Sequence, residues 1–263
     1  MNTKLSGAQL VLVEIKRVGR NYLPLIENIR SRFIKYIDFY PATYLPGTTT
    51  AGVNSSADMF MTIFNEFGTE EIHREMPLER FDYQQTLGVR QPVCSKIALQ
   101  RSYINCQDAS QVGKVAALVF WYDLPEYSAR NSTDKVITDA ISVPLTTAVR
   151  YNALPDTDRL TGKRFRRILL GTPSITPDYQ TGLTAVELAH CYLTLRKGTY
   201  NIVENLPVMM LWQLQMLEKS EFQNIIFDFQ NSYITIGGAG TIPNVQTDYI
   251  GKSIFFNLQY EGK

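Results

Sequence analysis

The segment Gly68-Thr69-Glu70-Glu71-Ile72 recurs later in the chain as Gly198-Thr199-Tyr200-Asn201-Ile202, at a separation of 130 residues. The same separation joins Ser102-Tyr103-Ile104 to Ser232-Tyr233-Ile234. Chance similarity between two β-rich halves would not hold one separation over so long a stretch. We therefore predict that the chain carries one structural unit twice in tandem.

Weaker matches extend the repeat toward both ends of the chain. They stay in order, at separations of 131 and 132 residues upstream and of 138 residues near the end, and the larger last value predicts a few extra loop residues around Gly237–Asp248 in the second copy. The matches are Asn21 with Asn152, Arg32-Phe33 with Arg164-Phe165, and Gly113-Lys114 with Gly251-Lys252.

Runs rich in β-branched and aromatic residues predict strands in both copies. Phe67-Gly68 and Lys197-Gly198 each lie between two such runs, and we expect a hairpin turn at both. The predicted strands are Leu10–Val18, Phe33–Tyr40, Met59–Phe67 and Val115–Tyr122 in the first copy, and Ile141–Val149, Phe165–Leu170, Val186–Leu195 and Ser253–Tyr260 in the second.

One short helix is expected in each copy, over Pro77–Leu87 and Pro207–Leu217. Proline suits the first turn of a helix, where the missing N–H group costs no hydrogen bond. The second segment is apolar on nearly all sides, so we expect it to be well buried.

The fold class that these patterns predict is all-β, with two tandem jelly-roll barrels or sandwiches. We expect the first jelly roll over residues 1–125, a linker over 126–140, where Ser, Asn, Asp and Thr are frequent, and the second jelly roll over 141–263. About six strands per copy are clear, while a jelly roll has about eight. A simpler sandwich is the structural alternative.

The charge balance argues against a nucleic-acid-coating protein. Lys and Arg number 26 and Asp and Glu number 25, which leaves a net charge of +1 and no surplus of cations for phosphate. The first 35 residues are locally basic, but too mixed with acidic residues to indicate a basic arm. No apolar run approaches the roughly 18 residues that span a bilayer, and the start lacks the apolar stretch of a signal peptide.

The search for catalytic and metal sites finds little. His73 and His190 are not equivalent in the repeat and have no partner at metal-ligand spacing. Asp156 and Asp158 lack the Gly and the distal Glu of a calcium loop. No phosphate loop, serine nucleophile motif or HExxH is present. We predict no enzyme and no organic cofactor, and a structural calcium ion has no assignable site. The three cysteines lack CxxC spacing, and we expect buried free thiols in a reducing cytoplasm.

Two basic clusters occupy matching places in the two copies. As solvated strand ends they would need no function, and this interpretation is favoured. The functional interpretation is that they face anionic lipid headgroups or acidic neighbours in an assembly. The residues are Arg30, Arg32, Lys35, Lys163, Arg164, Arg166 and Arg167.

Two tandem β-units, each with a Gly-Thr-x-x-Ile turn followed by proline and a helix, resemble the double jelly-roll major capsid proteins. The chain is most similar to the short forms in membrane-containing tailless icosahedral bacteriophages of the corticovirus and finnlakevirus type. The resemblance covers nearly the whole chain, and its motifs are architectural. The chain lacks the large tower insertions that bigger members of that family carry.

The resemblance implies a shell protein made in the host cytoplasm and located in the virion. Three chains would form a pseudo-hexameric capsomer that contacts neighbouring capsomers, a vertex or penton protein and an internal membrane or its proteins, with no direct nucleic-acid contact. Two alternatives stay open: a glycan-binding or glycoamidase-type double β-domain protein, and a minor vertex or spike protein of the virion.

Overall fold

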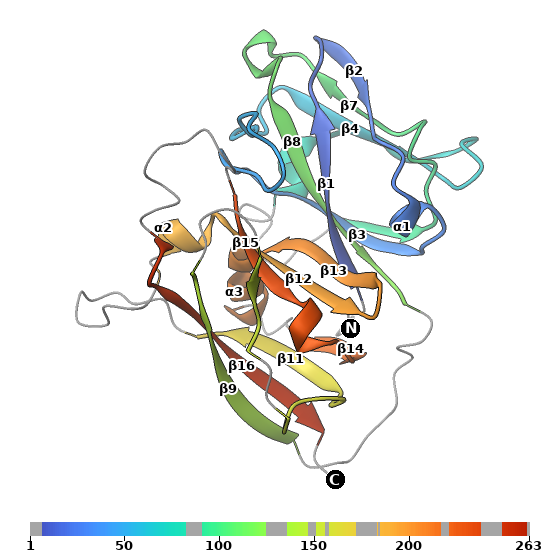
Figure 1. Ribbon diagram of the computed structural model, residues 1–263. Helices are drawn as coiled ribbons and strands as arrows, with labels where there is room; N and C mark the ends of the chain where they lie inside the picture. The colour runs from blue at the N-terminus through green and yellow to red at the C-terminus, as the bar shows by residue number, and fades with distance from the viewer. Residues whose placement is uncertain are drawn as a thin grey trace. The chain divides into compact units, whose positions relative to one another are not determined.

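The computed structural model describes residues 7–82, 91–124, 136–146, 151–155, 158–171, 183, 185–216, 221–237 and 249–261. The fold is all-β, as predicted, and every pair of named strands described below is antiparallel. Contacts divide the chain into two compact units (Figure 1). The first unit comprises residues 7–45 and 50–124. The second comprises the described residues from 136 onward, together with Pro46–Thr49.

The first unit consists of two four-stranded sheets. One has the order β1 (Gly7–Glu14), β8 (Val115–Tyr122), β3 (Ile34–Phe39) and β6 (Pro92–Ser95). The other has the order β2 (Gly19–Tyr22), β7 (Tyr103–Cys106), β4 (Met59–Phe64) and β5 (Glu71–Pro77).

The second unit also consists of two four-stranded sheets. One has the order β9 (Val136–Pro144), β16 (Ser253–Glu261), β11 (Phe165–Leu170) and β14 (Glu221–Ile225). The other has the order β10 (Asn152–Ala153), β15 (Tyr233–Ile236), β12 (Cys191–Lys197) and β13 (Tyr200–Pro207). Strand for strand, this is the order of the first unit.

Both predicted hairpin turns are confirmed. Gly68 joins β4 to β5 with a φ of 68°, and Gly198 joins β12 to β13 with a φ of 59°. Glycine adopts this left-handed conformation without the steric penalty that a Cβ atom brings. The quoted repeat therefore marks the same turn in each unit.

The helices agree with the prediction in the second unit only. There α3 (Val208–Met216) follows Pro207 and buries Val208, Met210, Leu211 and Leu214, with contacts to strands of both sheets. In the first unit Pro77 precedes a single 3-10 turn, η1 (Leu78–Phe81), and the predicted helix beyond Asp82 lies outside the described residues. The short helices α1 (Glu27–Arg30) and α2 (Ala185–Leu188) and the 3-10 turns η2 (Ala109–Gln111) and η4 (Phe229–Asn231) were not predicted.

The predicted linker boundary is wrong by several residues. Strand β9 begins at Val136, inside the linker expected over 126–140, and pairs along its whole length with β16. The five residues Val136–Ala140 are exposed or half-buried. The strand starts without the alternation of apolar and polar residues that marks a half-buried strand, so the sequence pattern conceals it. The rest of the predicted linker, up to residue 135, lies outside the described residues.

Buried serines repeat one arrangement in the two units. The Ser102 hydroxyl accepts from the backbone N–H of Phe64 (3.1 Å) and donates to the carbonyl of Ala98 (2.9 Å). Its repeat equivalent Ser232 accepts from the N–H of Arg196 (3.1 Å) and donates to the carbonyl of Asp228 (2.7 Å). Both serines are fully buried, so the repeat preserves the polar contacts inside each unit as well as the strand order.

The cores are built from inward-facing apolar residues of the strands. All eight residues of β8 are buried, and Trp121 donates its indole N–H to the buried carboxylate of Asp38 at 2.6 Å. In the second unit β16 alternates, with Ile254, Phe256 and Leu258 buried. The prediction of buried free thiols is correct for Cys106 and Cys191. Cys94 is a free thiol but is exposed, because it lies on the edge strand β6.

Candidate functional site

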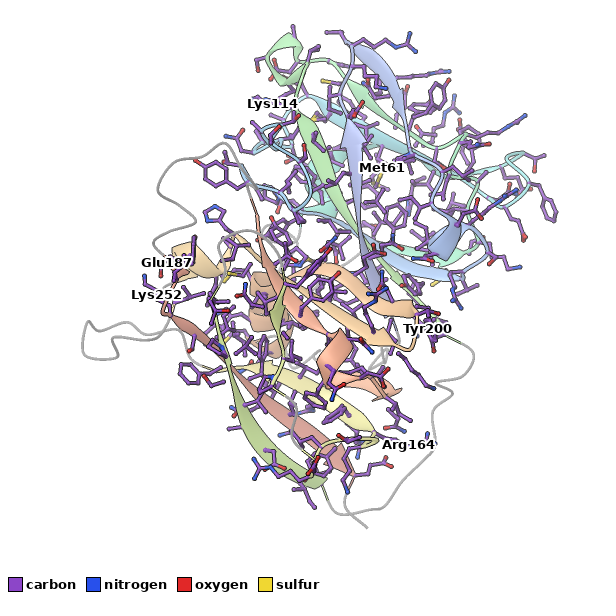
Figure 2. The ribbon with its side chains drawn as sticks, in the orientation of Figure 1. Met61, Lys114, Arg164, Glu187, Tyr200 and Lys252 are labelled. Carbon is purple, nitrogen blue, oxygen red and sulfur yellow. The ribbon has the colours of Figure 1, made fainter. Side chains whose placement is uncertain are left out.

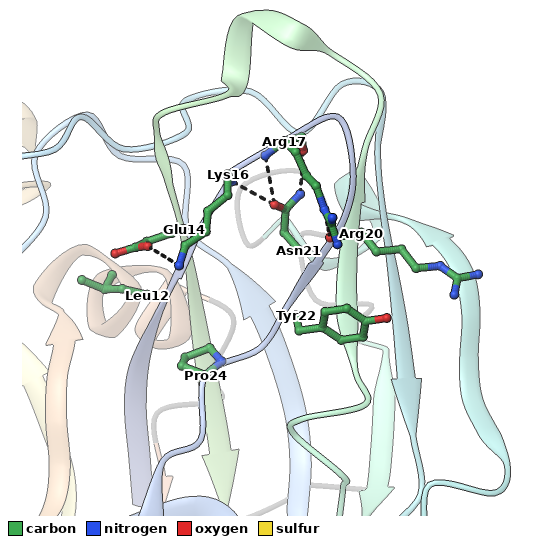
Figure 3. A pocket seen from close by; sticks show the side chains of 8 residues that line it. All are labelled: Leu12, Glu14, Lys16, Arg17, Arg20, Asn21, Tyr22 and Pro24. Carbon is green, nitrogen blue, oxygen red and sulfur yellow. Dashed lines mark hydrogen bonds and ion pairs between the residues drawn. The ribbon is translucent and has the colours of Figure 1, made fainter.

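A groove of about 550 Å³ lies on the first unit where β1 turns into β2 (Figure 3). Its lining combines three cations with one carboxylate and several apolar or aromatic side chains. We call it the Lys16 groove. Its lining residues are Leu12, Glu14, Lys16, Arg17, Arg20, Asn21, Tyr22 and Pro24.

Asn21 holds the turn that carries the cations. Its Oδ1 atom accepts from the backbone N–H groups of Lys16 (2.8 Å) and Arg17 (3.3 Å). Its Nδ2 atom donates to the carbonyls of Arg17 and Gly19, both at 2.9 Å. The Asn21 side chain is buried and Gly19 has a φ of 104°, so a compact turn is fixed from within. The three cations therefore project from a pre-organised backbone.

The cations of the Lys16 groove stay accessible. The Lys16 ammonium lies 3.1 Å from the Glu14 carboxylate, but both side chains are more than half exposed, so water screens this pair. Arg17 donates only its Nε–H, to the carbonyl of Arg20 at 3.2 Å. Within the described part of the chain, the outer nitrogens of both guanidinium groups have no hydrogen-bond partner. Several N–H donors therefore point into solvent.

Aromatic rings form one side of the site. The Arg20 guanidinium stacks over the Tyr103 ring at 4.8 Å, and Tyr22 meets the same ring edge-on at 5.7 Å. Tyr22 and Tyr103 are opposite residues in the pairing of β2 with β7. Because Tyr103 is buried and Tyr22 is 49% exposed, Tyr22 presents the accessible aromatic surface beside the cations.

The equivalent segment of the second unit keeps the asparagine and has fewer cations, although its residues 147–150 lie outside the described part of the chain. Asn152, the repeat partner of Asn21, accepts from the N–H of Thr146 at 2.8 Å. Tyr151 stands where the first unit has Arg20 and packs on Tyr233, the partner of Tyr103, at 4.3 Å. Only one cation, Arg150, occurs in the sequence of this turn. The positive charge is thus specific to the first unit.

The first predicted basic cluster does not line the Lys16 groove. Arg30 is exposed, with Glu27 at 3.7 Å. Arg32 donates its Nε–H to the carbonyl of Asn28 (3.2 Å) and lies over the Tyr122 ring at 5.9 Å. The side chain of Lys35 is 11% exposed and forms an ion pair with Asp123 at 2.7 Å. Both ion-paired cations are therefore partly neutralised within the unit.

The second predicted cluster flanks the strand β11 and is mostly half-buried. Lys163 lies over the Tyr260 ring at 5.6 Å. The backbone carbonyl of Arg164, a residue labelled in Figure 2, accepts from the N–H of Glu261 at 3.4 Å. Arg166 and Arg167 lie on β11 itself. Tyr260 is the repeat partner of Tyr122, so each unit holds a cation over the same tyrosine. Packing on this tyrosine therefore accounts for one cation of each cluster, although Arg32 corresponds in the repeat to Arg164 and not to Lys163.

A second groove, of about 590 Å³, contains Arg30. The turn between β4 and β5 lines it and presents Phe67, which is 79% exposed. Arg101 donates to the carbonyl of Gly68 at 2.9 Å and thereby fixes this turn. Its cations are offset by Glu27 and Glu66, so the groove has little net charge.

Sequence reasoning missed Lys16, Arg17 and Arg20, although a signal exists. Three cations occur within five residues, directly before an asparagine that the repeat preserves. Comparison of the two copies at this turn would have singled out the charge that only the first copy carries. The predicted clusters were chosen instead because they recur, which favours shared packing over a function of one copy.

Burial or hydrogen bonds shift the pKa values of several other titratable groups among the described residues. Burial lowers the pKa of His73 and of His190, whose Nδ1 lies 3.1 Å from the Tyr249 hydroxyl. Burial raises the pKa of Cys106 and of Cys191, so neither thiol is poised as a nucleophile. A hydrogen bond to Asp139 raises the pKa of Tyr260. Within the described ranges, no group of three His, Cys, Asp or Glu side chains is arranged to hold a metal ion.

Among the helices that the structure describes, none has the length and apolar character to cross a membrane. Comparisons with protein-family models, with curated proteins and with solved structures find no match for this chain.

Proposed function

We propose that the chain is the major capsid protein of an icosahedral virion. It would build the shell from trimeric, pseudo-hexameric capsomers and would have no enzymatic role. The observation that carries the proposal is the strand order. Numbered within each unit, the sheets have the orders 1-8-3-6 and 2-7-4-5, and both units repeat them. We interpret this order as that of an eight-stranded jelly roll, an architecture that viral capsid domains share with lectins.

Symmetry supports the assembly. Three chains with two similar units each supply six similar wedges, so a closed ring of three chains imitates a hexamer. The capsomers would meet neighbouring capsomers and a vertex protein, above an internal membrane, in a virion assembled in the host cytoplasm. A chain with a net charge of +1 suits a shell that does not bind the genome directly.

An uncharged sheet face on the second unit supports contact between chains. Ala140, Ser142 and Pro144 of β9 are exposed on it, beside Phe255 of β16, which is 45% exposed. Charged residues are scarce at the cores of protein interfaces, where large apolar groups are common. This face is therefore our candidate for a surface between neighbouring chains.

The oligomeric state tests the proposal. Light scattering on the purified full chain should give trimers, and electron microscopy of the particle should show the chain as a lattice of trimers. Ala140→Glu should dissociate the trimer because it buries an unpaired charge in the interface. Ala109→Glu, at an exposed position of η2, is the matched control and should stay trimeric. A wild-type monomer at high concentration would contradict the proposal, and a low copy number in the particle would indicate a vertex or spike protein instead.

The glycan-processing alternative receives little support from the tryptophans. Trp121 is fully buried and Trp212 is half-buried in α3, so the two do not form an open stacking platform. Amidase activity that a single carboxylate substitution abolishes would favour that alternative over a shell protein.

A further inference from the structure

We propose that the Lys16 groove binds an anionic sugar, that is, a sugar unit carrying a sulfate, phosphate or carboxylate group. The site lies within the first unit and does not depend on the capsid proposal. Three observations carry it: cations with free donors, a turn fixed in advance, and an accessible aromatic ring beside them.

The donors match an anion in number and kind. Arg17 and Arg20 retain their outer N–H groups, and planar guanidinium groups bind oxyanions through paired hydrogen bonds. The Lys16 ammonium points toward Glu14, the one carboxylate of the lining, and away from the Arg20 guanidinium (Figure 3), so the donors that remain free are those of the two arginines. The lining therefore has a net positive charge, in contrast to the nearly neutral groove beside Phe67.

The backbone of the site requires little ordering when a ligand binds. The four hydrogen bonds of the buried Asn21 side chain fix the turn between Lys16 and Gly19. Stacking on Tyr103 limits the motion of Arg20. Pre-organisation lowers the entropic cost of binding, so a small ligand can bind measurably.

The neighbouring side chains favour a sugar as the carrier of the anion. Tyr22 is 49% exposed and supplies aromatic surface on the same side as Arg17 and Arg20, whereas Leu12 lies beside Glu14 (Figure 3). Sugar rings present C–H faces that pack on such surfaces, while their charged substituents reach the cations. A nucleic acid would need a longer basic stripe, which a chain with a net charge of +1 does not offer.

The second unit serves as an internal comparison. It preserves the asparagine, which again accepts from a backbone N–H group, but in the sequence Tyr151 replaces Arg20 and residues 147–150 contain a single cation. The second unit repeats the strand order without the other charges, so the fold of a unit does not require Lys16, Arg17 and Arg20. A binding role in the first unit accounts for them.

Calorimetric titration of the full chain tests the site with a sulfated tetrasaccharide, its desulfated form and inorganic sulfate. We expect one saturable site per chain for the sulfated tetrasaccharide, weaker binding of sulfate and no binding of the desulfated form. Arg17→Gln with Arg20→Gln should weaken tetrasaccharide binding about tenfold or more, because charge-assisted hydrogen bonds are lost. Arg74→Gln with Arg80→Gln is the control and removes equal charge from β5 and η1. Strand β5 is the edge strand opposite β2 in the same sheet, so this variant should change affinity less than about twofold.

The aromatic contribution is tested separately. Tyr22→Ala should weaken binding of the tetrasaccharide several-fold and leave sulfate binding unchanged, whereas Tyr22→Phe should preserve both. Thermal unfolding of each variant confirms that it is folded. Equal losses in both double variants, or tetrasaccharide binding no tighter than that of sulfate, would overturn the proposal. Binding of anionic lipid vesicles without binding of the tetrasaccharide would also overturn it.

Discussion

Two non-glycine residues of the first unit have left-handed backbone conformations at positions where the second unit has asparagine. Cys94 has a φ of 48° and its repeat partner Asn224 has a φ of 43°. Glu75 has a φ of 43° and its partner Asn205 has a φ of 50°. Asparagine tolerates this region better than most residues do, because its short polar side chain bonds locally. The first unit therefore bears a strain that the second unit relieves.

Cys94→Asn should stabilise the first unit by about 0.5–1 kcal/mol, since part of the left-handed penalty disappears. Cys94 is exposed, so no core packing is lost. Urea denaturation would show a higher midpoint with an unchanged slope. Equal midpoints for the wild type and the variant would contradict the strain interpretation.

Residue-level features were only partly predictable from the sequence. The repeat paired Asn21 with Asn152, but hydrogen bonds from Asn21 to the backbone of Lys16 and Arg17 depend on the path of the turn. The stack of Arg20 on Tyr103 depends on the pairing of β2 with β7, which joins segments about 80 residues apart. Such long-range pairing is not specified by local propensity, so the sequence did not reveal the Lys16 groove.

At the scale of elements, one buried hydroxyl in each unit completes the backbone hydrogen bonding of a strand. Ser102 accepts from the N–H of Phe64 at the end of β4, and Ser232 accepts from the N–H of Arg196 near the end of β12. The alanine variant would leave each N–H without its partner. The same serine-to-alanine substitution can therefore be tested independently in each unit.

Ser102→Ala and Ser232→Ala should each lower the free energy of unfolding by about 1–3 kcal/mol, the usual cost of an unsatisfied buried group. Ser142→Ala, on the exposed side of β9, is the control and should change it by about 0.5 kcal/mol or less. Chemical denaturation measures all three. A cost for only one of the buried serines would show that the shared geometry does not carry equal energy.

The strength of the strand signal determined which elements the sequence predicted. Val115–Tyr122 and Phe165–Leu170 were predicted with their observed bounds, because the first is a continuous run of buried apolar and aromatic residues and the second has a buried residue at both ends and in its middle. The two-residue strand Asn152–Ala153 is too short to show any periodicity. Between Val186 and Cys191 an apolar composition hid the helix α2, since short apolar runs suit a strand or a buried helix equally.

At the scale of the whole molecule, burial of the two histidines predicts acid sensitivity. His73 lies in the first unit and His190 in the second, and burial lowers the pKa of both below 6.5. The unfolded chain then binds protons more readily than the folded chain does. The contribution of the two neutral histidines to the free energy of unfolding is therefore fully present above about pH 6.5, and it is lost as the pH falls through the folded pKa values.

Denaturation curves from pH 7.5 to 5 should show this loss, and the variant His73→Gln with His190→Gln should show a smaller one. Glutamine keeps a polar side chain at each position and removes the titration. The comparison uses the slope of the free energy of unfolding against pH, so a loss of stability that is equal at every pH does not affect it. Identical slopes for the two proteins would contradict the assignment to histidine.

The repeated strand order has a consequence for how the chain folds. When one chain contains the same topology twice, a strand of one copy can pair in the sheet of the other copy during folding. Such misassembly is characteristic of multidomain and repeat proteins. Strands β8 and β16 hold the same place, yet their sequences, Val-Ala-Ala-Leu-Val-Phe-Trp-Tyr and Ser-Ile-Phe-Phe-Asn-Leu-Gln-Tyr-Glu, differ at most positions. A misplaced strand would leave cavities or clashes in the foreign core. Divergence between the copies thus protects the nascent chain from exchanging strands with itself.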